Sequence, residues 1–232
     1  MRARPWPGSV APATEPAGRT DGARRAMYDG LLLDIGGVIL DPWRALDAYA
    51  AARGVAVPGR GPADLGNDPL WRDKVAGTLT LDGYWDRVAH ATGHADWRAM
   101  FRSITELVPD ELFDAHAVAL MRDARAAGRR VGVLSNDAYT IQSRAFFDSR
   151  PEFSGLDAFV DASDVGVRKP ESAIYVLAAR ALGLGTASVV FLDDVPENVE
   201  GARAVGMCGV DVDPGDAPAA FARARELLGI TA

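Results

Sequence analysis

The stretch VVFLDD at residues 189–194 is an apolar run of strand length that ends in two adjacent carboxylates, Asp193 and Asp194. Two more runs, LLLD at 31–34 and VGVLSN at 131–136, end in polar residues in the same way. Short apolar runs of this kind are typical of buried strands in a parallel sheet. Because the carboxyl ends of parallel strands line one crevice of an open sheet, we expect these polar residues to meet there.

The chain around these runs alternates between helical and strand patterns. Strands are expected at 130–134, 158–160, 188–192 and 208–212. Helices are expected at 110–127, 139–147, 171–182, 197–205 and 217–228. Strand–helix alternation of this kind predicts an α/β fold with a doubly wound, Rossmann-like parallel sheet.

Residues 42–114 interrupt the alternation with helical patterns and no strong strand. The helices are expected at 43–53, 69–77, 81–92 and 96–107. A connection this long has the size of a small subdomain. We therefore expect a helical cap at 42–114, inserted into a core domain formed by 27–41 and 115–232. Residues 1–26, rich in Pro, Gly, Ala and Arg without apolar periodicity, are expected to form a disordered N-terminal tail.

Composition narrows the class of partner. The 232-residue chain is 48% hydrophobic and carries a net charge of −7. This charge argues against a nucleic acid or an anionic membrane and favours a small molecule, and no apolar stretch approaches the roughly 20 residues that span a bilayer. One cysteine, Cys208, excludes an internal disulfide and indicates a reducing, cytoplasmic location. Its place in a predicted strand favours a buried structural thiol, and the oligomeric state stays open.

Two of the polar strand ends carry groups that suit a phosphate. Asp34 precedes Gly36-Gly37, so its carboxylate can approach a phosphorus atom and act as a nucleophile. The alternative is an aspartate that caps a turn, which is common before two glycines. Ser135 and Asn136 can donate hydrogen bonds to phosphoryl oxygens, and residues at this point can also cap the helix that follows.

The remaining charged residues indicate a metal. Asp193 and Asp194 are costly side by side after a buried run unless a cation neutralises them. Mg²⁺ prefers hard oxygen ligands, so this pair, Asp34 and a backbone carbonyl make a candidate magnesium site. Lys169, before a proline, can balance the charge of the nucleophile and of the phosphoryl group, or it can be a solvated surface lysine. Asn198 is placed to orient a carboxylate or Lys169.

In their order and spacing these segments resemble the four motifs of the haloacid dehalogenase-like (HAD) hydrolase superfamily, in the branch with a helical cap after the first strand. The segments are 34–38, 134–136, 166–175 and 191–198, and the resemblance covers about 28–228. The resemblance implies that Asp34 is the nucleophile and also a metal ligand. It implies that the backbone carbonyl of Gly36 is a further ligand. The other protein oxygens for Mg²⁺ would come from Asp193 and Asp194, directly or through water.

The same resemblance gives the phosphate-binding and catalytic residues. It implies that the phosphoryl oxygens are held by Ser135, Asn136 and Lys169. With the nucleophile, the catalytic set is then Asp34, Ser135 and Lys169. We expect a Mg²⁺-dependent phosphatase that hydrolyses a small phosphate ester, with sugar phosphates favoured, through an aspartyl-phosphate intermediate.

Gly36 departs from the family pattern, because phosphatases of the family usually carry a second aspartate at this place. That aspartate protonates the leaving oxygen and later activates water, and such help is typically worth about 10²–10⁴-fold. Three explanations stay open. The substrate has a good leaving group, such as an anomeric phosphate; or another acid substitutes, with Asp41, His90 and His94 as candidates; or hydrolysis is lost and the protein binds a phosphometabolite or a protein partner without turnover. Dehalogenation of 2-haloacids is less favoured, because it needs no metal and the acidic pair indicates one.

Several residues of the expected cap are candidates for substrate contacts. The candidates are Trp43, Arg60, Trp71, Arg72, Trp85, His90 and Arg102. Trp43 and Arg44 lie just past the first linker and are the best placed. Trp71 and Trp85 have helical spacings that favour the hydrophobic core of the cap instead.

Overall fold

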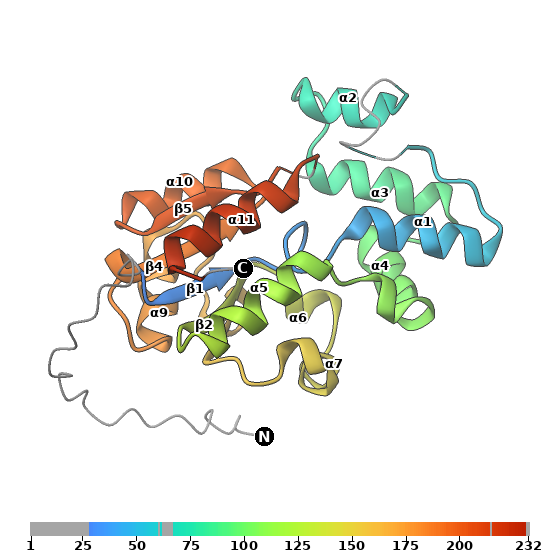
Figure 1. The fold of residues 1–232 in the computed structure, drawn as a ribbon. Helices are drawn as coiled ribbons and strands as arrows, with labels where there is room; N and C mark the ends of the chain where they lie inside the picture. Colours follow the sequence, from blue (N-terminus) through green and yellow to red (C-terminus); the bar gives the residue numbers. More distant parts are fainter. Residues whose placement is uncertain (1–27, 60, 62–66, 214, 231–232) are drawn as a thin grey trace, which may run out of the picture.

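The computed structural model describes residues 28–59, 61, 67–213 and 215–230 (Figure 1). Its centre is a five-stranded parallel sheet with the strand order β3-β2-β1-β4-β5. The strands are β1 (Gly30–Leu33), β2 (Arg130–Ser135), β3 (Ala158–Asp161), β4 (Val189–Asp193) and β5 (Cys208–Asp211). The predicted doubly wound α/β fold is confirmed. The tail expected at 1–26 lies outside the described residues.

The register of the central strands explains why the polar residues come together. Leu33 at the end of β1 is aligned with Val133 of β2 on one side and with Leu192 of β4 on the other. The backbone N–H of Asp34 extends this pairing by donating to the carbonyl of Leu192 at 2.9 Å. The residues that follow the three strands therefore leave the sheet at one edge.

Helices cover both faces of the sheet (Figure 1). Leu31 and Leu33 of β1 belong to a buried apolar cluster that includes residues of α5 (Ala115–Ala126) and α11 (Ala217–Leu228). Leu32 points to the other face, where the cluster includes α9 (Ser172–Ala181) and α10 (Pro196–Ala204). Because both faces are buried, the strands need continuous apolar runs, and the sequence supplies them.

Between β1 and α5, the described residues form four α-helices that lie to one side of the sheet (Figure 1). They are α1 (Pro42–Arg53), α2 (Pro69–Val75), α3 (Leu81–Ala91) and α4 (Trp97–Leu107). The two linkers that join them to the sheet run side by side. The Asp41 N–H donates to the Leu112 carbonyl at 2.7 Å, and the Asp114 N–H donates to the Ile39 carbonyl at 2.9 Å. These paired linkers connect the helices to the sheet.

Two predicted helices are wrong in their extent. The expected helix at 110–127 begins only at Ala115, after a 3₁₀ turn at Pro109–Glu111. The helix starts there because the Asp114 carboxylate accepts hydrogen bonds from the N–H groups of His116 and Ala117. The expected helix at 139–147 is two short helices, α6 (Ala138–Ile141) and α7 (Arg144–Ser149). Ser143 breaks the run by capping α7, since its hydroxyl accepts from the Phe146 N–H.

Short elements complete the described chain. They are α8 (Ala162–Val165) and 3₁₀ turns at Pro151–Phe153 and Thr186–Ser188. Cys208 is a free thiol, but it is only partly buried, because β5 is an edge strand with a neighbour on one side only. The expectation of a buried thiol is therefore wrong. Within the described ranges, every helix is too short or too polar to cross a membrane.

Candidate active site

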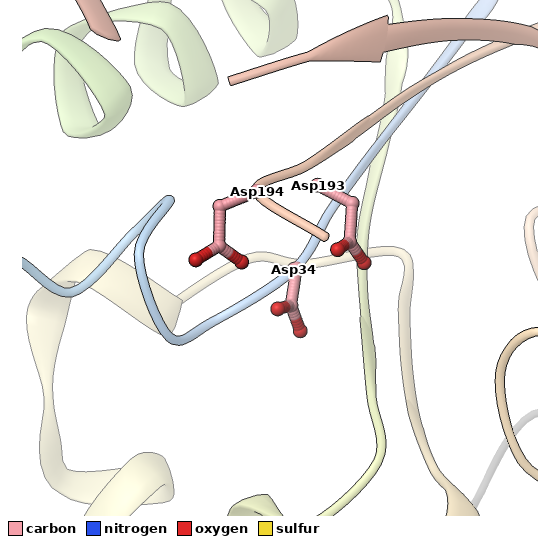
Figure 2. A group of neighbouring side chains, drawn as sticks. All are labelled: Asp34, Asp193 and Asp194. Carbon is pink, nitrogen blue, oxygen red and sulfur yellow. The ribbon is translucent and has the colours of Figure 1, made fainter. Parts of the chain in front are cut away.

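Three carboxylates meet where the central strands end (Figure 2). Asp34 follows β1, Asp193 is the last residue of β4, and Asp194 follows it. Each side chain offers an oxygen, and these oxygens all lie within 4.8 Å of one another. The structure therefore brings together the three acids that the sequence predicts to share a site.

Lys169 is the buried counter-charge of this group. Its side chain is 1% exposed, and its Nζ lies 2.8 Å from Oδ1 of Asp34 and 2.6 Å from Oδ2 of Asp193. Burial alone would lower the pKa of Lys169, but the two carboxylates outweigh this effect and raise it above its ordinary value. The ammonium is thus charged at every physiological pH and fixes the position of Asp34. The alternative of a solvated surface lysine is wrong.

Asp193 is held by donors on both of its oxygens. The Val195 N–H donates to Oδ1 at 2.9 Å, and the Asn198 side-chain amide donates to both oxygens at 3.0 and 3.2 Å. Tyr175 supports this arrangement, because its hydroxyl donates to the Asn198 carbonyl at 2.7 Å. Asn198 therefore orients a carboxylate, one of the two roles considered for it. Asp34 and Asp194 keep more oxygen free for a ligand than Asp193 does.

Ser135 and Asn136 stand beside these acids at the end of β2. The Ser135 hydroxyl accepts hydrogen bonds from the N–H groups of Asp137 and Ala138 at 3.2 and 3.0 Å, so its own proton is available to a phosphoryl oxygen. The Asn136 side chain pairs with the backbone of Lys169, accepting from its N–H at 2.8 Å and donating to its carbonyl at 3.2 Å. Asn136 thus positions Lys169, and its second amide N–H is the group it has left for a phosphate.

The electrostatics of the site fit a divalent cation. Burial raises the pKa of Asp34 well above its usual range, and Asp193 and Asp194 add to the rise while Lys169 opposes it. Burial, together with Asp193, raises the pKa of Asp194 to about 7. Three carboxylates thus face one ammonium, and their oxygens are the hard donors that Mg²⁺ prefers. The residues present therefore fit a magnesium ion held by Asp34 and Asp194, with Asp193 beside them.

These shifts predict how the metal-free protein responds to pH. An acid whose pKa is raised by folding binds protons more tightly in the folded state, so it favours folding below its unfolded pKa and loses this contribution as the pH rises through its folded pKa. In EDTA, the thermal unfolding midpoint should therefore fall between about pH 4 and pH 7, the window set by Asp194. Added Mg²⁺ should restore stability at pH 7 and above. If the thermal unfolding midpoint in EDTA does not fall over this pH range, the buried carboxylates do not repel one another as expected.

The two glycines after β1 differ in what they permit. Gly37 has a positive φ of 74°, and a Cβ on it would lie 2.3 Å from Oδ2 of Asp194, so a side chain there would displace that carboxylate. Gly36 is exposed, and a Cβ on it would meet no atom within 4 Å. The site thus needs glycine at 37 for geometry, whereas at 36 it has room for the acid that it lacks.

The three candidates for a substitute acid all have other contacts in the structure. The Asp41 carboxylate caps α1 and accepts from the N–H groups of Trp43 and Arg44. His90 pairs through Nε2 with the Ala95 carbonyl at 2.9 Å. His94 uses both ring nitrogens, one with the Tyr49 hydroxyl and the other with the Thr92 hydroxyl.

The residues predicted as possible substrate contacts differ in their burial. Trp71 and Trp85 are 7% and 8% exposed and form part of the apolar core, as their helical spacing indicates. Trp43 is partly buried and stacks on Trp85, with ring centroids 4.4 Å apart. Arg72, His90 and Arg102 are exposed, and Arg60 lies outside the described residues.

Sequence reasoning did not single out two cations on α2 and α4 whose charges favour the ionised form of acids at the strand ends. The charge of Lys74 on α2 stabilises the ionised form of Asp194, and the charge of Arg98 on α4 does the same for Asp137. Lys74 lies over the ring of Trp71 and Arg98 over that of Trp97, at 4.6 and 4.2 Å. No motif marks either residue, because helical periodicity does not tell which face of a cap helix turns toward the core.

The parallel sheet with acids at the carboxyl ends of its strands defines an α/β protein with a ligand site at that edge, and comparison with known proteins gives the family. The family model described as haloacid dehalogenase-like hydrolase matches residues 28–206. This span is well over half of the chain, so the protein belongs to that family.

Individual relatives are distant. A Mycobacterium tuberculosis protein described as a phosphatase is 34% identical over 93 residues, which cover 40% of this chain and only 43% of the relative. A sesquiterpene phosphatase of Aspergillus oryzae is 25% identical, and the aligned region covers 87% of this chain and 97% of that protein. A fructose-1-phosphate phosphatase of Escherichia coli is 28% identical, and the aligned region covers 80% of this chain and 96% of that protein.

A solved structure supports the fold. A dehalogenase crystallised with an intermediate complex superposes with a TM-score of 0.57 at 19% identity, over 88% of this chain and 99% of that chain. At this identity the likeness concerns the fold alone.

Proposed function

We propose that this protein is a Mg²⁺-dependent phosphatase that hydrolyses a small phosphorylated metabolite through an aspartyl phosphate on Asp34. The observation that carries the proposal is the fixed carboxylate of Asp34, 2.8 Å from the buried Lys169 ammonium and grouped with Asp193 and Asp194. An anionic nucleophile that is fixed in place beside a cation is suited to attack an anionic phosphate, because the cation reduces the repulsion between the two negative groups. Relatives described as phosphatases support the same reaction.

The residues of the chain divide the work as follows. Asp34 attacks phosphorus, and the bond to the leaving oxygen breaks. The Ser135 hydroxyl and the Lys169 ammonium hold the phosphoryl oxygens, and Asn136 keeps Lys169 in place through two backbone hydrogen bonds. Water then cleaves the acyl phosphate and releases Asp34. When bound, Mg²⁺ would neutralise the carboxylates and the phosphoryl charge, with Asp34, Asp194, the Gly36 carbonyl and, directly or through water, Asp193 as its ligands.

Helices α1–α4 would act as a cap over this site, with residues 42–114 as the mobile unit. The paired linkers at Ile39–Asp41 and Leu112–Asp114 give a narrow hinge for such closure. A closed cap excludes water from the acyl phosphate and brings the cap side chains to the substrate.

Sugar phosphates are the substrate class that we favour. Gly36 leaves the site without its usual acid, which suits an ester with a good leaving group, such as an anomeric phosphate. The fructose-1-phosphate phosphatase relative supports a sugar, whereas the sesquiterpene phosphatase relative is the main alternative.

The test is phosphate release from a panel of esters, with Mg²⁺ and with EDTA. The panel includes anomeric and primary-alcohol sugar phosphates, a prenyl phosphate, nucleotides and an aryl phosphate. Mg²⁺-dependent release is expected, with the highest kcat/KM on a sugar phosphate. If folded, Mg²⁺-binding protein releases no phosphate from any ester and is not stabilised by beryllofluoride, a phosphoryl mimic, the proposal fails and binding without turnover takes its place.

The space at Gly36 gives a gain-of-function prediction. Because a side chain at 36 meets no atom within 4 Å, Gly36→Asp should fold normally and place a carboxyl beside Asp34. If no other side chain protonates the leaving oxygen, kcat/KM for alkyl phosphates should rise by about 10²-fold, with little change for an aryl phosphate, whose leaving group needs no proton. Gly36→Asn is the matched control, since it fills the same space without an acid. Equal kcat/KM for the two variants on alkyl esters would show that another group of the chain already supplies the proton.

A further inference from the structure

Asp137 differs from most of the aspartates that begin helices in this fold, although Asp216 at the start of α11 likewise makes no capping bond. Five such residues accept a hydrogen bond from a backbone N–H of their own helix: Asp41, Asp68, Asp96, Asp114 and Asp161. Asp137 begins α6, but its side chain makes no capping bond, because the Ser135 hydroxyl accepts from the Asp137 and Ala138 N–H groups instead. Within the described residues its carboxyl accepts no hydrogen bond. A carboxyl without a hydrogen-bond partner therefore follows directly on Ser135 and Asn136 in the chain.

The surroundings of Asp137 place it between the core and the cap helices. On the core side it directly follows Asn136, and the charges of Lys169 and Asp161 act on it. On the cap side the charges of Arg98 on α4 and Asp82 on α3 act on it. The same helix, α6, is joined to α4, because the Gln142 side chain donates to the Thr105 hydroxyl.

This boundary is where the leaving group of a bound ester has to lie. The phosphoryl group sits against Asp34 and Lys169 in the core, so the rest of the ester extends toward the cap. Asp137 follows β2 and would approach the leaving oxygen from that strand, whereas a side chain on residue 36 would approach it from β1.

We propose that Asp137 is the general acid and base of this enzyme, in the place that Gly36 leaves vacant. The inference rests on the proposed phosphatase function. In the first step an oxygen of the Asp34 carboxylate bonds to phosphorus, the bond from phosphorus to the leaving oxygen breaks, and that oxygen takes the proton of the Asp137 carboxyl. In the second step the Asp137 carboxylate takes a proton from water, whose oxygen bonds to phosphorus as the bond to Asp34 breaks. Alcohol and inorganic phosphate leave, and both aspartates return to their starting states.

The local electrostatics agree with this role. Burial raises the pKa of Asp137 above its ordinary value, and Asp161 and Asp82 add to the rise while Lys169 and Arg98 oppose it. A raised pKa keeps more of the acid protonated toward neutral pH, which is the form that the first step uses. Activity on alkyl esters should therefore decline as the pH rises and Asp137 loses its proton.

The test compares two esters in the variant Asp137→Asn. One is the best alkyl phosphate of the panel and the other is p-nitrophenyl phosphate, whose leaving group needs no proton. We expect kcat/KM for the alkyl ester to fall by about 10²–10³-fold and kcat/KM for the aryl ester to change by less than about threefold. The decline of alkyl-ester activity at high pH should disappear. Adding Gly36→Asp to Asp137→Asn should restore hydrolysis of the alkyl ester, and Asp137→Glu should retain part of it.

The control is Asp164→Asn, which removes an exposed carboxyl on α8 that pairs with Arg144 outside the site. It should leave the ratio of alkyl to aryl activity unchanged. Thermal unfolding tests whether Asp137→Asn is folded, and Asp137→Ser, with a smaller side chain that can also cap α6, replaces it if it is not.

The outcomes separate this inference from the function on which it rests. Equal losses on both esters, or an unchanged ratio and pH profile in an active enzyme, would overturn the role of Asp137 and leave the phosphatase standing. Failure of the wild-type protein to release phosphate from any ester would overturn both.

Discussion

Asp34→Asn is expected to reduce phosphate release by about 10⁴–10⁶-fold, because it removes the atom that attacks phosphorus while keeping the shape of the side chain. Lys169, Asp193 and Asp194 would stay in place, so substrate binding should change much less than kcat. The measurement is single-turnover phosphate release with the best ester of the panel. Full activity of the variant would exclude an aspartyl phosphate on this residue.

The same variant should be more stable than the wild type when no metal is present. Burial raises the pKa of Asp34 well above its usual range, so its ionised form disfavours folding at neutral pH, and an amide relieves this. The midpoint of thermal unfolding in EDTA should rise at pH 7.5, while stabilisation by Mg²⁺ should shrink. Asp29→Asn is the matched control, since Asp29 lies just before the same strand and makes an exposed ion pair with Arg129. A fall in both stability and activity would indicate a misfolded variant instead.

The sheet and the grouping of the acids could be predicted from the sequence. Both follow from the apolar runs of the strands and from the rule that parallel strands end at one edge of the sheet. Each strand carries an apolar run that only a sheet buried on both faces accommodates, and the runs end in Asp34, Ser135 and Asp193. Parallel strands in register then bring their last residues to one edge, as the alignment of Leu33 with Val133 and Leu192 shows. The site follows from the order of the strands.

The errors concern features that depend on single capping contacts or on tertiary neighbours. Periodicity continues through Ser143 and Asp114, so the sequence pattern predicts unbroken helices where a side-chain oxygen in fact starts a new one. Cys208 has the pattern of a buried strand, but its exposure depends on β5 being the edge of the sheet, which the pattern does not give.

The roles of the polar site residues were predictable only in part. Ser135 and Asn136 both carry groups that can bind phosphate, but the structure shows that Asn136 pairs with the backbone of Lys169 across 33 residues of sequence. Likewise, the position of His94 in the sequence does not reveal that Tyr49 and Thr92 occupy both of its nitrogens. Pairings between distant residues are set by the packing of the whole fold.

Lys169 stands out in a chain that has only two lysines, Lys74 and Lys169, and uses arginine for its other cationic side chains. A compact ammonium can contact Asp34 and Asp193 at once in a space that is 1% exposed, whereas the planar guanidinium of arginine is larger and pairs best side-on with one carboxylate. Lys169→Arg should therefore lower activity although it keeps the charge.

Lys169→Met should be the most destabilising single change in the site. It keeps the length of the side chain but leaves the buried carboxylates of Asp34 and Asp193 without their counter-charge, which costs about 3–5 kcal/mol when one partner of a buried pair is removed. Chemical denaturation at pH 7.5 measures the loss, and the loss should shrink at pH 5, where the carboxylates take up protons in place of the ammonium. Lys74→Met makes the same chemical change at a partly buried cap residue and should cost less than about 1 kcal/mol. If the two variants lost equal stability at both pH values, the ammonium of Lys169 would not be what holds Asp34 and Asp193 together.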